Sequence, residues 1–233
     1  MHTRLSALIL AALLTLNLHA AGPDYAKLVN ASFDGILWDL DDNYAFTETQ
    51  MSGDTRTVAR FDPSAPEGEQ WTLLSYDNRP PSLEETEAFV DEKSWRRGPD
   101  TGGTDGIIKL IDTTTLTLLE ASGDYWLLSF KPTVNIDDSD DLAFLQDMIG
   151  ELRINRESGH IDYVDIRNSR AIRPVIGTKI QSMVMRFEFT ELGDNGPRVL
   201  SHVSAGAKGS ALLVVRFNEL ERFDFSDFAY VGD

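Results

Sequence analysis

The sequence predicts a mainly β fold of the α+β type, in which two or three helices cover one strongly curved antiparallel sheet, open or closed as a barrel. The chain holds roughly ten to twelve strand-like segments, and hairpin-length turns separate most of them. The regular βα alternation of a parallel sheet is absent. No internal repeat or composition break marks a second domain, so we expect residues 21–233 to form a single domain.

The first 20 residues have the pattern of a secretory signal peptide. Arg4 supplies a positive charge, Leu5–Leu16 is apolar, and Leu18–Ala20 ends in a small residue that a signal peptidase accepts. The apolar run is about 12 residues long, shorter than the roughly 20 that a membrane-spanning helix needs. We therefore expect cleavage after Ala20, a periplasmic location and no stable membrane insertion.

The composition argues against several classes of function. Asp and Glu number 38 against 21 Lys and Arg, a net charge of -17, which would repel nucleic acid and anionic membrane faces. The chain contains no cysteine, so disulfides, thiolate metal sites and an N-terminal lipid anchor are excluded. A large exported chain without cysteine fits the periplasm of a Gram-negative bacterium.

The N-terminal third predicts a helix, a hairpin and a capped helix. A loose apolar stripe behind Asp24 predicts a helix over residues 24–40, which Gly35 weakens near its end. Ser82 and Glu85 form a capping box for a short helix that ends near Lys93. The strands expected between these helices are Tyr44–Met51, Thr55–Phe61 and Gln70–Tyr76.

The middle of the chain predicts a glycine-rich loop, three strands and a helix. Arg96–Gly106 contains four glycines and a proline and is the best candidate for a mobile loop. The acidic run Asp137–Asp141 favours the start of a third helix, with Leu142, Leu145 and Ile149 on one stripe. The strands expected between them are Ile107–Ile111, Thr114–Ala121 and Tyr125–Lys131.

The C-terminal third predicts further antiparallel strands. Lys179–Glu191 has the clearest alternation, and Gly206–Ser210 is interpreted as a connection between strands. Arg222–Val231 is expected to be the last edge strand. The other expected strands are Glu151–Arg156, Ile161–Arg167, Arg198–Ser204 and Ala211–Phe217.

No pattern of catalytic or metal-binding residues emerges, so we expect no enzyme, cofactor or metal. After the signal segment only two histidines remain: His160 in a turn, interpreted as solvated, and His202 on a strand, a possible base without an evident partner. The acidic clusters Asp39–Asn43 and Asp137–Asp141 lack the glycine and distal glutamate of an EF-hand loop. Helix capping explains the second cluster, and calcium binding stays an open alternative.

Large apolar side chains that share strand faces are the candidate site residues. They either fill an ordinary core or line an apolar cavity on the concave face of the sheet, where methionine adapts to varied acyl shapes. The candidates are Trp71, Leu73, Trp126, Leu128, Phe130, Met183, Met185, Phe187 and Phe189.

The order of parts resembles that of the superfamily of LolA- and LolB-like periplasmic lipoprotein carriers. In amino-acid sequence, three short stretches look like a segment of uncharacterised proteobacterial envelope proteins associated with that fold: Arg60–Pro63, Gln70–Ser75 and Arg79–Ser82. The resemblance covers most of residues 21–233 in layout. It implies an unclosed half-barrel sheet covered by helices, with an apolar cavity between them that holds lipid or lipoprotein acyl chains.

The sequence therefore predicts a soluble periplasmic carrier or binding protein that holds a lipid, an acyl chain or a lipoprotein. One rival is an envelope sensor or scaffold that binds a protein partner through an exposed sheet edge. Another is a small-molecule enzyme that uses the same cavity, with a polar cluster containing His202 or a desolvated carboxylate.

Overall fold

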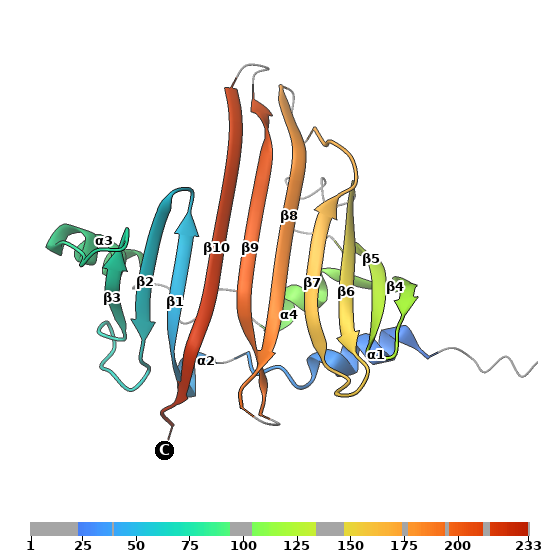
Figure 1. The fold of residues 1–233 in the computed structure, drawn as a ribbon, viewed down its shortest axis with the longest axis horizontal. Coiled ribbons are helices and arrows are strands. Elements are labelled where there is room, and N and C mark those ends of the chain that lie inside the picture. The colour runs from blue at the N-terminus through green and yellow to red at the C-terminus, as the bar shows by residue number, and fades with distance from the viewer. Residues whose placement is uncertain are drawn as a thin grey trace, which may run out of the picture.

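Ten antiparallel strands form one open sheet, in the order β3-β2-β1-β10-β9-β8-β7-β6-β5-β4, which confirms the predicted fold class (Figure 1). The computed structural model describes residues 23–38, 40–93, 104–133, 147–173, 177–193, 196–211 and 215–232. Within these residues, the edge strands β3 and β4 do not pair with each other, so the barrel is not closed.

Each strand pairs with the next strand in the sequence, except that β3 and β4 form the two edges of the sheet. The pairing of β1 with β10 joins the three N-terminal strands to the rest of the sheet. The strands are β1 (Tyr44–Ser52), β2 (Thr55–Phe61), β3 (Trp71–Tyr76), β4 (Ile111–Ala121), β5 (Tyr125–Pro132), β6 (Met148–Asn155), β7 (Ile161–Asn168), β8 (Thr178–Glu191), β9 (Arg198–Ala211) and β10 (Val215–Tyr230). Gly53 has a φ of 59° in the turn between β1 and β2, the left-handed geometry that glycine adopts without strain.

In the described part of the chain, four helices accompany the sheet: α1 (Tyr25–Phe33), α2 (Leu40–Asn43), α3 (Leu83–Lys93) and α4 (Thr104–Lys109). Asp24 caps α1, and its carboxylate accepts a hydrogen bond from the Lys27 amide. The predicted capping box of α3 is confirmed, because the Ser82 amide donates to the Glu85 carboxylate at 2.8 Å and the Glu85 amide donates back to the Ser82 hydroxyl. None of the helices in the described residues is long and apolar enough to cross a bilayer.

The core lies on one face of the sheet, and α1 and α3 pack against it there. Phe33 of α1 makes an edge-to-face contact with Phe189 of β8, and Phe89 of α3 makes one with Trp71 of β3. Ile107 of α4 is fully buried in the same core. We call this side of the sheet the helix-side face.

The first predicted helix is shorter than the sequence pattern indicates. Residues 35–37 leave the helix and join the sheet, because Ile36 forms a parallel bridge to Arg198 and the Leu37 amide donates to the Arg198 carbonyl at 2.7 Å. Sheet hydrogen bonds thus replace the last turns of the expected helix over 24–40, and the separate helix α2 follows.

The expected strand Ile107–Ile111 is wrong, because most of this segment belongs to α4 and β4 begins only at Ile111. A short apolar run has no periodicity that distinguishes a buried helical turn from a strand. Thr104–Gly106, expected in the mobile loop, also belong to α4, while residues 96–103 lie outside the described part of the chain.

Three further expectations for the second half need correction. Ile149 lies in β6 rather than in a third helix, and residues 137–146 of that expected helix lie outside the described residues. Gly206–Ser210 is not a connection but part of β9, where Gly206 pairs with Leu220. The predicted final edge strand Arg222–Val231 is the continuation of β10, which lies between β1 and β9 inside the sheet.

His160 is less solvated than the sequence indicates. Its ring packs against Gly35, where an added Cβ would be 2.9 Å from the imidazole Cε1 atom. The imidazole Nδ1 is buried and has no hydrogen-bond partner in the described structure.

Candidate functional site

Strand register places the predicted apolar residues of β5 to β8 on one face. Leu128 lies opposite Leu152, Leu152 opposite Val164, and Val164 opposite Phe187. Because residues that face each other across antiparallel strands point to the same side, these side chains form one row across four strands. Phe187 continues the row to Val203 of β9.

The nine candidate residues all lie in the core or pack against it, at two places along the sheet. Trp71 and Leu73 lie at the β3 end, under α3, and the other seven lie on β5 and β8. Five of the nine are buried: Trp71, Leu73, Leu128, Phe130 and Phe189. Four are half-buried and pack against that core: Trp126, Met183, Met185 and Phe187.

Burial decreases along β8, away from α1. Phe189 is 5% exposed and is covered by the rings of Phe33 and Trp38. The next residues on the same face, Phe187 and Met185, are only half-buried. We call the half-buried set the apolar strip; it consists of Met183, Met185 and Phe187 of β8, Val203 of β9 and Phe223 of β10.

The apolar strip ends at an open groove of about 490 Å³. Met183 lines this groove beside the small residues Ala205, Gly206 and Ala207 of β9. The remaining lining residues are Ser52, Gly53, Asn218, Glu219, Leu220 and Glu221.

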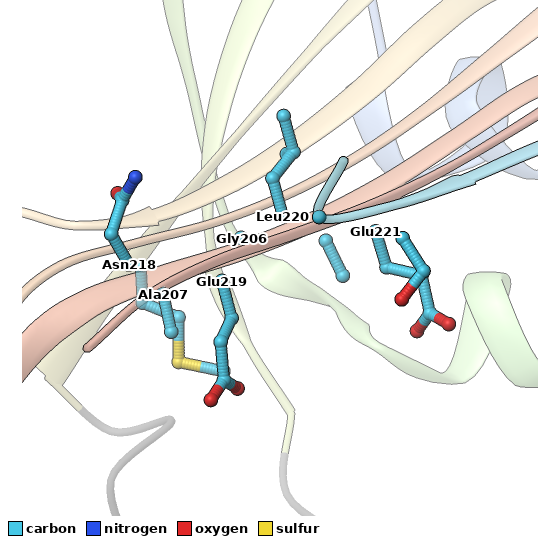
Figure 2. Close-up of a pocket in the computed structure, with 10 residues that line it drawn as sticks. Gly206, Ala207, Asn218, Glu219, Leu220 and Glu221 are labelled. Carbon is cyan, nitrogen blue, oxygen red and sulfur yellow. The ribbon is translucent and has the colours of Figure 1, made fainter. Parts of the chain in front are cut away.

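The two sides of β10 differ at the groove, as Figure 2 shows. Glu219 and Glu221 project to one side of the strand, whereas Asn218 and Leu220 project to the other. Glu219 pairs with Ala207, which in turn pairs with Met183, so the two glutamates lie on the face of the apolar strip. The groove therefore has an apolar floor and an acidic rim.

A buried ion pair fixes α3 to the helix-side face. The Lys93 ammonium lies 2.6 Å from the Glu48 carboxylate of β1, and both side chains are 4% exposed. The same ammonium lies 4.6 Å from the ring centroid of Trp71. No local sequence pattern indicates this pair, because the two residues are 45 positions apart. Because the pair lies inside the core, we interpret it as a structural contact that holds α3 in place rather than as a solvent-accessible site.

His202 has a partner that the sequence does not reveal, but it lies on the face opposite the apolar strip. Its Nδ1 atom is 2.7 Å from the Asp224 carboxylate, and its neighbour Val203 belongs to the apolar strip. Burial by itself would raise the pKa of Asp224, but hydrogen bonds from Arg222 and His202 outweigh that effect and lower it. The polar cluster around His202 is therefore separated from the apolar residues by the thickness of the sheet.

Charged rows cover this opposite face at β6 to β8. Asp165 is 6% exposed and accepts a hydrogen bond from Arg167 at 2.8 Å, while Arg186 lies 3.7 Å from it. The Arg186 guanidinium also stacks 4.3 Å from the Tyr163 ring centroid. Such cross-strand pairs stabilise a sheet face that lies in water.

The structure does not assemble a metal site in the described residues, where no group of three or more His, Asp or Glu side chains is arranged to hold an ion. Asp41 and Asp42 of the first acidic cluster lie in α2. The second cluster, Asp137–Asp141, lies outside the described residues, so calcium binding there stays a hypothesis.

Comparisons with known proteins assign the chain to no family. No family model matches it, and no curated protein matches it. Among solved structures, GphF Dehydratase 1 is 8% identical, with 82% of this chain and 77% of that chain covered and a TM-score of 0.15. An isomerase-inactive variant of GphF DH1 is also 8% identical, with 90% and 82% covered and a TM-score of 0.14. Similarity this low carries no argument about fold or function.

Proposed function

We propose that the chain is a periplasmic carrier or binding protein that holds an acyl chain of a lipid or lipoprotein on the helix-side face of its sheet. The observation that carries the proposal is the gradient of burial along β8. Phe189 is covered by α1, whereas Phe187, Met185 and Met183 are half-buried and lead to an open groove.

An apolar ligand would complete the burial of this strip. Burial of apolar surface yields about 25 cal/mol per Å², so an acyl chain laid along the strip would gain stability from both surfaces. The thioethers of Met183 and Met185 are flexible and polarisable, which suits acyl chains of differing shape. The small side chains of Ala205 and Ala207, opposite the two methionines, leave space above the sheet.

The rim of the groove favours a ligand without negative charge. Glu219 and Glu221 lie where the head of a bound acyl chain would reach water. A free fatty-acid carboxylate beside them would be repelled, whereas an acyl ester or amide would not. The preferred ligand is thus a neutral acylated molecule, which is consistent with the resemblance to lipoprotein carriers and with the expected export signal.

Binding of the neutral fluorescent probe N-phenyl-1-naphthylamine tests this proposal. We expect saturable fluorescence enhancement that a monoacylglycerol reverses, and weaker competition by a fatty acid. Met185→Glu should abolish the enhancement, because an unpaired carboxylate in an apolar site costs several kcal/mol. Val184→Glu is the matched control, since Val184 is also half-buried but lies on the opposite face.

A second pair of variants keeps the test valid if Met185→Glu unfolds the protein. Ala205→Trp fills the space opposite Met185 without burying a charge, whereas Ser204→Trp places the same ring on the opposite face. Probe binding that is lost in Ala205→Trp and kept in Ser204→Trp supports the apolar site. If Met185→Glu and Ala205→Trp both bind the probe as well as the parent does, the proposal is refuted.

A second candidate function is binding of a protein partner through the edge strand β4. Leu118 and Leu119 of this strand are 36% and 54% exposed, and within the described residues no strand pairs with its outer side. An added strand from a partner would satisfy that edge. Native mass spectrometry of protein purified from the periplasm discriminates the two functions, because a carrier retains lipid and a scaffold retains a polypeptide.

A further inference from the structure

The long central strands end in a groove rich in basic residues. In Figure 1 the upper ends of β8, β9 and β10 extend beyond the neighbouring strands. Lys179 of β8, Lys208 of β9 and Arg216 of β10 line an open groove of about 660 Å³ there. The other lining residues are neutral: Gln181, Gly209, Ser210, Phe217 and Asn218.

Strand register places the three cations on one face. Lys179 and Arg216 both lie opposite Ser210, one from each side. Lys208 is two residues before Ser210 on the same strand and therefore projects to the same side. The antiparallel bridge between Ile172 and Ile180 places Arg173 opposite Lys179, which extends the row of basic positions. We call Arg173, Lys179, Lys208 and Arg216 the basic tip.

The charges of the basic tip are not neutralised within the described residues. None of its four side chains has an ion pair or hydrogen bond there, whereas Arg167, Arg186 and Arg222 of the same face are all paired with carboxylates.

The sequence around the basic tip is depleted of acid. No Asp or Glu occurs from 166 to 187 or from 195 to 218, although the chain carries 38 acidic residues. One carboxylate near this end is Asp54, in the turn between β1 and β2. That turn contacts β10 at Leu220, which is four residues beyond Arg216. In a chain of net charge -17, four unpaired cations at one end form a strong local field of the opposite sign.

We propose that the basic tip docks the protein onto an anionic membrane surface by binding the phosphate groups of lipid headgroups. Three of the cations line an open groove across β8 to β10, and Arg173 lies beside it, next to the Ile172–Ile180 bridge. This spread matches an extended array of phosphates better than a single enclosed anion. Val215, next to Arg216 at the start of β10, is 56% exposed and adds an apolar contact at the same end. The acidic remainder of the chain is repelled by such a surface, so the protein docks with β8 to β10 pointing toward the lipid.

This site is independent of the proposed acyl site. Lys208 and Ser210 alternate along β9 with Ala205 and Ala207, so the basic tip and the groove beside Met183 lie on opposite faces. Loss of docking and loss of acyl binding can therefore be observed separately.

Co-sedimentation with vesicles tests the proposal. The purified protein should bind vesicles that contain phosphatidylglycerol, should not bind pure phosphatidylcholine vesicles of the same acyl composition, and should be released by added salt. Each Lys or Arg near an anionic surface contributes about fivefold to affinity, so Lys208→Gln and Arg216→Gln should each weaken binding about fivefold and the double variant about 25-fold. Lys27→Gln removes an equal charge at an exposed position of α1, at the other end of the sheet, and should leave binding unchanged.

Three outcomes would overturn the proposal. The first is equal binding to neutral and anionic vesicles, since the acyl chains alone would then account for it. The second is undiminished binding by the double variant, whose folding circular dichroism verifies. The third is tight binding of inorganic phosphate in the absence of vesicles, which would assign the groove to a soluble anion.

Discussion

The ring of Phe130 lies against Gly150 on the neighbouring strand, so closely that an added Cβ on Gly150 would be 2.1 Å from the ring Cζ atom. The glycine thus makes room for an aromatic side chain that is only 2% exposed. The two residues form one packing unit of the core between β5 and β6.

We expect Gly150→Ala to lower the free energy of unfolding by about 2 kcal/mol, because the added methyl group forces Phe130 out of its position. Urea denaturation measures the change. Gly123→Ala is the control, since nothing lies within 4 Å of its added Cβ. Equal stability of the two variants would show that Phe130 can move without cost.

The Lys93–Glu48 pair predicts an asymmetry between single and double variants. Lys93→Met, Glu48→Leu or Glu48→Gln alone should lower the free energy of unfolding by about 3 to 5 kcal/mol, because each leaves the other group buried without its partner. The double variant Lys93→Met with Glu48→Leu should recover most of that loss. A double-mutant cycle in urea measures the coupling between the two sites.

A surface pair supplies the comparison for this cycle. Arg170 and Asp147 form an ion pair with side chains that are 74% and 42% exposed. Asp147→Asn should cost less than about 1 kcal/mol. If Glu48→Gln costs equally little, the buried pair does not hold α3 in place.

The capping box predicts a specific dependence on acid. Hydrogen bonds from Arg79, and then from the Ser82 amide, lower the pKa of Glu85 from 4.5 to about 2. A lowered pKa in the folded state means that Glu85 stabilises the protein fully above pH 4.5 and that this stabilisation is lost as the pH falls through 2. The stability difference between the parent and Glu85→Gln should therefore shrink between these two pH values.

NMR titration of the Glu85 carboxyl carbon measures that pKa directly. For the stability comparison with Glu85→Gln, the matched control is Glu84→Gln, because within the described structure the Glu84 side chain has no partner. A Glu85 midpoint near 4.5 would contradict the capping arrangement.

The backbone geometry of the turn after β3 predicts how substitutions of Asn78 change stability. Asp77 and Asn78 have φ values of 48° and 61°, the left-handed pair of a two-residue hairpin turn that joins Tyr76 to Arg79. Asn78→Val should lower the free energy of unfolding by about 1 to 2 kcal/mol, because a β-branched side chain is strained there, whereas Asn78→Gly should not lower it. Thermal unfolding followed by circular dichroism ranks the variants, and an unaltered Asn78→Val would show that the turn has another geometry.

Local patterns predicted those parts of the fold that neighbouring residues determine. The turn at Gly53, the capping box at Ser82 and the alternation of Met183 through Phe189 each depend on a few successive residues. The pattern around Ile107 failed because a short apolar run fits either a helix or a strand. The glycines of Gly206–Ser210 favour a connection between strands by local pattern, but cross-strand neighbours keep Gly206 paired within β9.

The candidate site could be predicted only in part. The period of two placed Met183, Met185 and Phe187 on one face, which the register confirms. Burial along that face depends on where α1 packs, and no local pattern encodes that position. The partner of His202 and the neutral surroundings of Lys208 depend on strands that meet only in the folded sheet.

The pairing of β1 with β10 also determines when the sheet can be completed during synthesis. Thr49 lies opposite Asp224, so the N-terminal hairpin acquires this neighbour only after nearly the whole chain has been made. Until then β1 exposes an unpaired edge, to which a strand of another nascent chain could add. Contacts between residues so distant in sequence also slow folding, because a long loop must close before they form. A chain of this topology gains from being held unfolded until its last strand is available.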